Sequence, residues 1–490
     1  MAIPKDDEPR ALAPLALLVA MGAPVVLAIL TRCGFLNVWF RTDDFVWLLA
    51  ARNADFGGAV RDAFELPDGP TPYFRPLVDA YFFCMYRTVG TNALAYQVAN
   101  LTLFAATGAV LGLVTLRLTR SVMIAGLAGV LFVVSPSYGP LIAWPSGATA
   151  IISAFFSMAT LLFFIAWLQD RRQPWVLGLA VLAFSLSLLA KEEASALPPV
   201  LLLTALFIRR PKTASDLRAI GLALAPIVLV WVAYLAPQFI LSIGSETKDY
   251  YGFGWHGVRR LIDSMVWLSL PWGSYVGDWV SPASWAAFAF FSATAAVALL
   301  RRQWVLPGLY ASTVLMLAPA AFLDSRFAPR WTYLATLPWA VFVAALGTFA
   351  YEWLAARQRK IALGVGVVVS AAAVALLGGQ SIDSQNHEGV RDFAGNYHRI
   401  ERLLASNCPE LASGETVYVL PLRLGAYEYA VPAEIHLFFP KAQVFLTKPG
   451  DFAEASLPPS GCTLYWTREA GFQVAPVPPT DPSLRFLVTQ

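Results

Sequence analysis

The sequence predicts a polytopic α-helical membrane protein that ends in a small α/β domain. Hydrophobic residues make up 57% of its 490 residues and charged residues only 14%, and the mean hydropathy is +0.58. So much apolar surface cannot be buried inside one soluble core. The net charge of +3 is small and the sequence has no basic low-complexity arm, so its composition does not indicate nucleic acid as a partner.

Apolar segments of spanning length recur along the chain and predict about eleven membrane helices. They lie near residues 11–31, 96–116, 122–136, 148–168, 175–190, 195–208, 219–240, 282–300, 304–323, 331–350 and 361–377. The first segment is expected to be retained, because Thr31-Arg32-Cys33-Gly34 is a poor match to a signal-peptide cleavage site.

Basic residues indicate how these helices are oriented. They cluster in alternate connections, at Arg117 and Arg120, Arg171 and Arg172, Arg209, Arg210 and Lys212, Arg301 and Arg302, and Arg357, Arg359 and Lys360. The positive-inside rule places these connections in the cytoplasm, and Lys5 and Arg10 place the N-terminus there too. With an odd number of spans, the C-terminal region lies outside. The chain is therefore expected to consist of a membrane module, residues 1–377, and an extracytoplasmic α/β domain, residues 378–490. The first outer loop, residues 32–95, also faces outward.

Two neighbouring acids, Asp43 and Asp44, follow the first apolar segment in this loop. Placing carboxylates beside the membrane costs free energy, so such residues usually mark a functional site. One of the two could act as a general base on an acceptor hydroxyl. Neighbouring residues cannot point the same way, so at most one is expected to face a given substrate atom. The alternative is that Thr42 or Asp43 simply caps a helix that begins near Asp44, which is compatible with catalysis.

Arg75 lies further along the same loop, directly before Pro76. The proline bars Arg75 from helical geometry and starts a helix at the next residue. The guanidinium could therefore bind a phosphate at a helix N-terminus, or pair with Asp43 or Asp44. An ordinary interfacial arginine that reaches the lipid head groups is an equally good interpretation.

Two further outer connections contain cations. In Lys191-Glu192-Glu193, Lys191 could hold an anionic head group and Glu192 could orient it, or the triplet could be a solvated turn. Arg326 and Arg330 face outward against the positive-inside pattern, which favours an anionic ligand such as a phosphate. Pairing of these arginines with Asp324 is the competing interpretation.

Short helices at the membrane surface are expected at Phe45–Phe56, Leu77–Tyr86 and within Tyr250–Tyr275. In the C-terminal region, residues 393–404 have helical spacing, and residues 416–420 and 443–446 are short β-prone runs.

The C-terminal region contains no nucleophile elbow, phosphate loop or metal motif, so no chemistry is assigned to it. Cys408 and Cys462 could pair if this region lies outside the cytosol. None of the four histidines fits a metal site.

Together these motifs resemble the GT-C superfamily of glycosyltransferases that use polyprenyl-phosphate sugars, notably the protein O-mannosyltransferases and the lipid A aminoarabinose transferases. The matching residues, in order within residues 11–350, are Asp43-Asp44, Phe74-Arg75-Pro76-Leu77, Lys191-Glu192 with Pro198, and Arg326 through Tyr333. The O-mannosyltransferases carry Asp-Glu where this chain has Asp43-Asp44, so the nearest branch and the identity of the base stay open.

The resemblance implies an enzyme that transfers one sugar from an undecaprenyl- or dolichyl-phosphate carrier to a hydroxyl of a lipid, glycan or protein. It implies an integral protein of the bacterial inner membrane that acts on its extracytoplasmic face. By residue, it implies Asp43 or Asp44 as the base, Arg75, Lys191, Arg326 and Arg330 as contacts of the carrier phosphate, and Glu192 and Tyr333 as orienting residues. A divalent cation could assist, although two carboxylates do not define a metal site.

A transporter or flippase of a lipid-linked sugar is the alternative function. A transporter would also need cationic side chains on the outer face. Its polar residues, however, should be distributed through the membrane helices, and broken helices should occur at corresponding positions in the two halves of the protein. In this sequence the polar residues gather on one face instead, which favours the enzyme.

Overall fold

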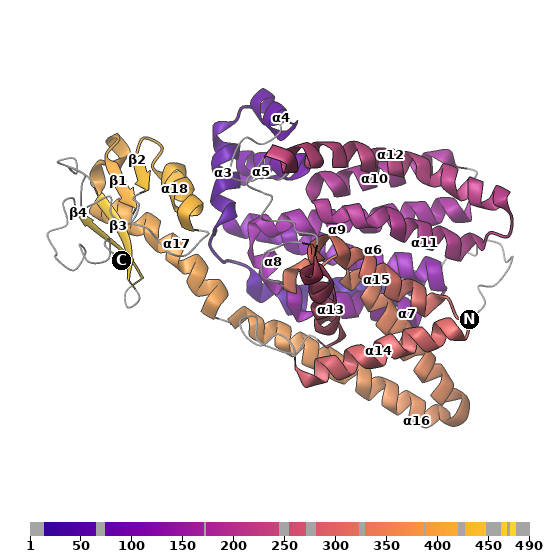
Figure 1. Ribbon diagram of the computed structural model, residues 1–490. Helices are drawn as coiled ribbons and strands as arrows, with labels where there is room; N and C mark the ends of the chain where they lie inside the picture. Colours follow the sequence, from indigo (N-terminus) through magenta and orange to yellow (C-terminus); the bar gives the residue numbers. More distant parts are fainter. Residues whose placement is uncertain are drawn as a thin grey trace.

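The computed structural model describes residues 14–64, 74–170, 173–244, 254–270, 281–322, 329–386, 388–419, 427–446, 462–467 and 471–476. Within these ranges the chain is mainly helical, and the helices form an elongated bundle with a small sheet at one end (Figure 1). Arg326 and His387 lie outside the described residues.

The first membrane helix packs closely on its neighbours. It consists of α1 (Pro14–Leu17), a π-helical turn η1 (Leu18–Gly22) and α2 (Ala23–Arg32). A Cβ atom on Gly112 of α6 (Ala93–Thr119) would lie 2.0 Å from the Ala20 carbonyl oxygen, and one on Gly129 of α7 (Val122–Val134) would lie 2.4 Å from Pro24. Glycine is therefore required at both positions, because it allows these backbones to approach.

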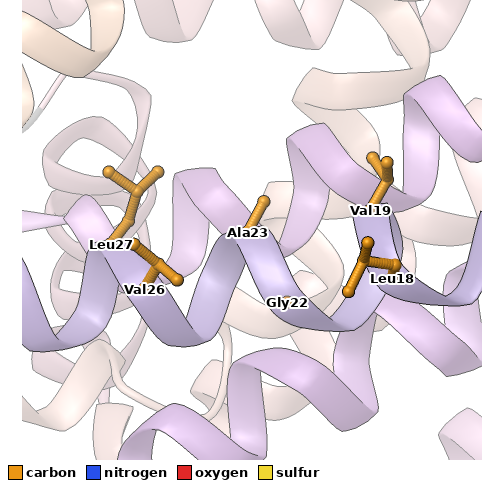
Figure 2. A pocket seen from close by; sticks show the side chains of 6 residues that line it. All are labelled: Leu18, Val19, Gly22, Ala23, Val26 and Leu27. Carbon is orange, nitrogen blue, oxygen red and sulfur yellow. The ribbon is translucent and has the colours of Figure 1, made fainter. Parts of the chain in front are cut away.

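The same helix has a shallow apolar hollow of about 440 Å³ on its surface (Figure 2). Its lining residues all come from this one helix and are Leu18, Val19, Gly22, Ala23, Val26 and Leu27. No polar side chain lines the hollow, so we assign no chemistry to it.

The remaining long helices coincide with the predicted apolar segments. They are α9 (Ala148–Gln169), α10 (Pro174–Ala190), α11 (Leu197–Arg209), α12 (Ala214–Gly244), α14 (Pro282–Leu300), α15 (Val305–Ala321) and α16 (Thr336–Asn386). α16 covers residues 336–350 of the tenth predicted segment and all of the eleventh, and it has a non-helical residue between them, Gln358, with φ −147°.

Six helices of the described chain are long and apolar enough to cross a membrane, and shorter apolar helices pack among them. The chain is therefore a polytopic integral membrane protein, as predicted. The count of eleven spans stays a prediction.

Three helices outside the apolar segments lie at the end of the bundle that faces the C-terminal region (Figure 1). They are α3 (Asp43–Asn53), α4 (Phe56–Phe64) and α5 (Pro76–Val89), all in the first predicted outer loop, and α3 and α5 correspond to two of the expected surface helices. α13 (Trp255–Ser269) lies within the third expected segment, and α8 (Gly139–Ala143) is a short helix between α7 and α9.

The C-terminal region is an α/β unit, as predicted. It contains α17 (Glu388–Asn407), β1 (Thr416–Val419), α18 (Tyr427–Phe438), β2 (Gln443–Leu446), β3 (Cys462–Thr467) and β4 (Gly471–Pro476). The strand order is β2-β1-β3-β4; β1 is parallel to β2 and β3, and β4 is antiparallel to β3. Cys408 and Cys462, which the sequence allowed to pair, form a disulfide.

Glu434 of α18 is an acid buried in this unit. It is 1% exposed, and neither carboxylate oxygen has a hydrogen-bond partner among the described residues. Burial raises the pKa of Glu434 well above its usual value, and the charge of Glu401 on α17 raises it further. The carboxyl group is therefore more stable in the neutral form in the folded protein.

We expect Glu434→Gln to stabilise the protein at alkaline pH. An acid whose folded-state pKa exceeds the unfolded value of about 4.3 binds more protons when folded, so wild-type stability falls as the pH rises above that value, until the folded-state pKa is passed. Glutamine does not ionise, so the variant should lose less stability over this range. Thermal melts between pH 5 and pH 9 measure the difference, with the exposed Glu410→Gln as control. Parallel curves for wild type and Glu434→Gln would contradict the assignment.

Candidate active site

The acidic pair lies at the start of α3, after a strained turn. Thr42, the residue before the helix, has φ 45° and ψ −117°, a backbone conformation that β-branched residues rarely adopt. Its side chain makes no capping hydrogen bond. Thr42 therefore sets the direction in which α3 begins and does not serve as its side-chain cap.

The two acids have different environments. Asp44 is fully buried; its Oδ1 accepts a hydrogen bond of 2.7 Å from the Ser146 N–H and another from the Ser146 hydroxyl. Its Oδ2 accepts one of 2.9 Å from the Arg41 N–H. Burial raises the pKa of Asp44 to about 7, against the effect of these three hydrogen bonds. Asp43 is only half-buried, so it is the more accessible of the two carboxylates.

Three loops meet at Trp144, next to this pair. The guanidinium carbon of Arg41 lies 5.4 Å from the centre of the indole ring, and that of Arg330 lies 5.6 Å from it. Such distances are typical of cation–π contacts. Trp144 directly precedes the 3₁₀ turn η4 (Pro145–Gly147), which contains Ser146, and Arg330 is in η7 (Pro329–Thr332). Arg330, predicted from the sequence, therefore contacts the same loop that holds Asp44.

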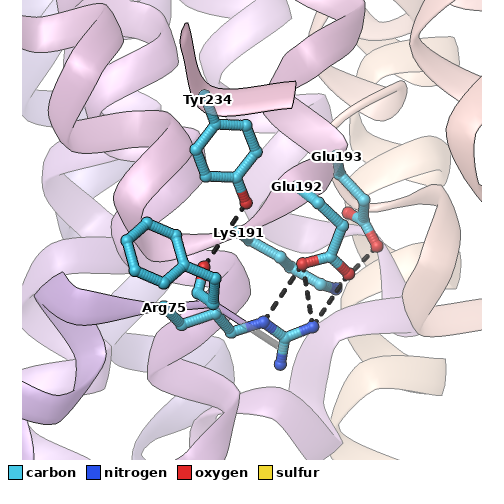
Figure 3. A network of polar contacts seen from close by, with 6 residues as sticks. Arg75, Lys191, Glu192, Glu193 and Tyr234 are labelled. Atoms are coloured by element: carbon cyan, nitrogen blue, oxygen red, sulfur yellow. Dashed lines mark hydrogen bonds and ion pairs between the residues drawn. The ribbon is translucent and has the colours of Figure 1, made fainter. Parts of the chain in front are cut away.

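Arg75, Lys191 and Glu192 form a second polar cluster (Figure 3). Arg75 Nη2 donates to Glu192 Oε1 at 2.8 Å, and its Nε donates to Glu192 Oε2 at 3.1 Å. Lys191 Nζ lies 2.6 Å from Glu193 Oε1. The Tyr234 hydroxyl of α12 donates to the Phe74 carbonyl oxygen at 3.5 Å. The cluster joins the start of α5 to η5 (Glu192–Ala196) and to α12.

These ion pairs differ from those considered from the sequence. Glu192 contacts Arg75, and Glu193 contacts Lys191, whereas Glu192 was expected to orient Lys191 and Arg75 was considered as a partner of Asp43 or Asp44. Although burial alone would raise it, the Arg75 guanidinium lowers the pKa of Glu192 below its usual value. Arg75 and Glu192 therefore form a bidentate salt bridge in which both groups are charged.

Tyr333, predicted as an orienting residue, lies in the aromatic core. It is 1% exposed, and its ring centre lies 4.8 Å from that of Tyr138 and 5.6 Å from that of Phe132. Packing accounts for these contacts, so the structure gives Tyr333 a place in the core and no contact with the acidic pair.

Sequence reasoning missed three polar residues. Ser146 and Arg41 hold Asp44, and Arg32, at the end of the first membrane helix, is fully buried and donates to the carbonyl oxygens of Val133, at 2.9 Å, and Ser135. Arg32 was visible in the sequence as a lone charge at the end of an apolar segment. No pattern in the sequence around Ser146 indicated that it would bind Asp44.

The described residues contain no group of three or more His, Cys, Asp or Glu side chains placed to hold a metal ion.

Comparisons with known proteins give the fold. No family model matches the sequence, and no curated protein matches it. Two structures of the oligosaccharyltransferase of Archaeoglobus fulgidus are similar in fold. The one tethered to an acceptor peptide has a TM-score of 0.57 at 12% identity, over 88% of this chain and 64% of that one. The one with an inhibitory peptide and dolichol-phosphate has a TM-score of 0.54 at 14% identity, over 86% and 63%. ArnT from Cupriavidus metallidurans, bound to undecaprenyl phosphate, gives a TM-score of 0.48 at 11% identity, over 92% and 93%.

The fold is therefore similar to that of this oligosaccharyltransferase, and the prediction of a GT-C-like fold is confirmed. This chain spans less than two thirds of the oligosaccharyltransferase, which has 63% to 64% of its length covered.

Proposed function

We propose that this protein is a membrane glycosyltransferase, a hexosyl- or pentosyltransferase, that moves a sugar from a polyprenyl-phosphate carrier to an acceptor hydroxyl. The observation that carries the proposal is that Asp44, the neighbour of Asp43, is held by Arg41 and Ser146, and that the guanidinium groups of Arg41 and Arg330 both lie over Trp144, two residues before Ser146. A carboxylate can accept the proton of the attacking hydroxyl, and arginines can stabilise the phosphate as it leaves.

The acidic partner of Arg75 limits what Arg75 can do for the phosphate. The Glu192 carboxylate neutralises it in this structure, and Glu193 likewise pairs with Lys191. A phosphate that binds there would have to share these cations with the acids. Arg75 and Lys191 thus have acidic partners, whereas the guanidinium of Arg330 contacts the aromatic rings of Trp144 and Trp331. Among the described candidates, we therefore assign Arg330 the first contact with the carrier phosphate.

The dolichol-phosphate of the archaeal oligosaccharyltransferase structure supports a lipid-phosphate carrier as the donor. The disulfide of the C-terminal unit supports an extracytoplasmic position for that unit, because disulfides persist in oxidising compartments. We therefore place the reaction on the outer face of the inner membrane, with the N-terminus in the cytoplasm. We propose residues 1–377 as the catalytic module and residues 378–490 as a separate extracytoplasmic domain.

Transfer from purified polyprenyl-phosphate sugars tests the proposal. The detergent-solubilised protein is mixed with radiolabelled donors that differ in sugar, and with lipid, glycan and peptide acceptors. We expect label to move from the donor to one acceptor class and the free carrier phosphate to be released. A flippase reconstituted in lipid vesicles would instead move the intact donor from one leaflet of the membrane to the other. Intact donor in every mixture, together with such movement, would overturn the assignment as an enzyme.

A further inference from the structure

The C-terminal unit contacts the helix that carries the acidic pair. Arg52, in the last turn of α3, donates from Nη1 to the carbonyl oxygens of His436, at 3.0 Å, and Leu437, at 2.6 Å. Both carbonyls belong to the last turn of α18. The last carbonyls of a helix have no hydrogen-bond partners within it, and they form the negative end of its dipole. A guanidinium at this position donates to two of these carbonyls and places a positive charge at the negative end of the dipole.

Aromatic side chains join the same two parts of the chain. Phe45, the residue after Asp44, and Tyr397 of α17 are both fully buried, and their ring centres are 5.1 Å apart. The Trp39 ring lies 4.3 Å from that of His398 and is stacked on Phe438 at 6.2 Å. Residues of α3, α5, α17, α18 and the sheet share one hydrophobic cluster, and Figure 1 shows α18 directly beside α3.

α3 is therefore held at both ends by different parts of the chain. Ser146 holds Asp44 at its start, and α18 holds Arg52 at its end. A helix of eleven residues moves as a rigid rod over about 16 Å at 1.5 Å per residue. A shift of its far end would consequently move Asp43.

We propose that the C-terminal unit is a positioning element of the active site, and that Arg52 is the positioning residue through which α18 fixes the orientation of α3. This inference rests on the proposed function only for its kinetic consequence. The physical coupling between α18 and α3 is independent of what the enzyme transfers. Misplacing a catalytic group by about 1 Å can slow a reaction about a hundredfold, so a smaller shift is expected to have a smaller effect.

Arg52→Met tests the coupling, since it keeps the aliphatic stem and removes the donors. We expect kcat to fall about tenfold, with the KM values for donor and acceptor changed less than about twofold, because the substrates do not contact Arg52 in this proposal. Arg52→Lys should recover part of kcat, since an ammonium can still donate to the two carbonyls. Arg61→Met, at an exposed arginine of α4 in the same loop, is the matched control and should leave kcat unchanged.

Hydrogen exchange of the α3 amides gives a second readout that does not need activity. Arg52→Met should accelerate exchange both in the last turn of α18 and along α3, and Arg61→Met should not. Unchanged exchange in α3 with unchanged kcat would overturn the inference. A raised KM for the acceptor at normal kcat would overturn it too, because it would make the C-terminal unit an acceptor-binding domain only. If no donor reacts with the wild type, the proposed function fails, but accelerated exchange in α3 would still support the coupling.

Discussion

Asp43→Asn should reduce the transfer rate by about a hundredfold to ten-thousandfold, the usual contribution of a positioned general base, while the protein folds normally. Asp43 is half-buried at the start of α3, so its carboxylate can meet a substrate hydroxyl. Asparagine has nearly the same shape but cannot accept a proton at neutral pH. The effect should therefore appear in kcat, measured as initial rates of sugar transfer at saturating donor and acceptor.

Asp44→Asn should act mainly on stability. The Asp44 carboxylate accepts three hydrogen bonds, two from Ser146 and one from the Arg41 N–H. An asparagine can accept on one side only, and its NH₂ would face a donor on the other. We expect a loss of about 1 to 3 kcal/mol, the cost of a buried group left without its partner.

Asp55→Asn is the matched control for both variants. Asp55 is exposed in the same loop and accepts a hydrogen bond of 2.6 Å from the Gly58 N–H, which asparagine can also accept. It should leave rate and stability unchanged. If Asp44→Asn proved stable and inactive while Asp43→Asn remained active, the roles of the two acids would be reversed.

The fold could be predicted largely because its signals are local. A run of twenty apolar residues identifies a membrane helix wherever it packs, and the break at Gln358 separates the two apolar segments of α16. β1 and β2 were also predicted as β-prone runs. α18 was not, because Pro432 lies inside it, and a proline usually marks the end of a helix.

The candidate site could be predicted only by residue type, since its contacts are not local. Asp44 and Ser146 are 102 positions apart, and Arg75 and Glu192 are 117 apart. The sequence indicated that these acids and cations lie near one membrane face, but it gave no basis for pairing Glu192 with Arg75. The same holds for Arg52, whose partners lie 384 and 385 positions away.

Removing one charge of the Arg75–Glu192 pair should destabilise the protein more than removing both. The two side chains are 12% and 20% exposed, so Glu192→Gln removes the acid of this pair from beside a mostly buried guanidinium. We expect a loss of about 2 to 3 kcal/mol, between the values for exposed and fully buried pairs. The double variant Arg75→Met with Glu192→Leu replaces the pair with apolar groups and should recover most of this stability. Thermal melts of the two single variants and the double variant measure the difference.

Activity of the double variant separates the two roles of Arg75. If Arg75 also contacts the carrier phosphate, the recovered protein should have a donor KM raised about tenfold to hundredfold, the value of one charge-assisted hydrogen bond. Arg259→Met, which removes an exposed ion pair with Asp263 in α13, is the control and should change neither quantity. A stable double variant with the wild-type donor KM would show that Arg75 and Glu192 only hold α5 against η5. Binding of the carrier phosphate would then depend on Arg330, whose guanidinium contacts aromatic rings. In that case Arg330→Met should raise the donor KM, whereas the Arg75 variants should not.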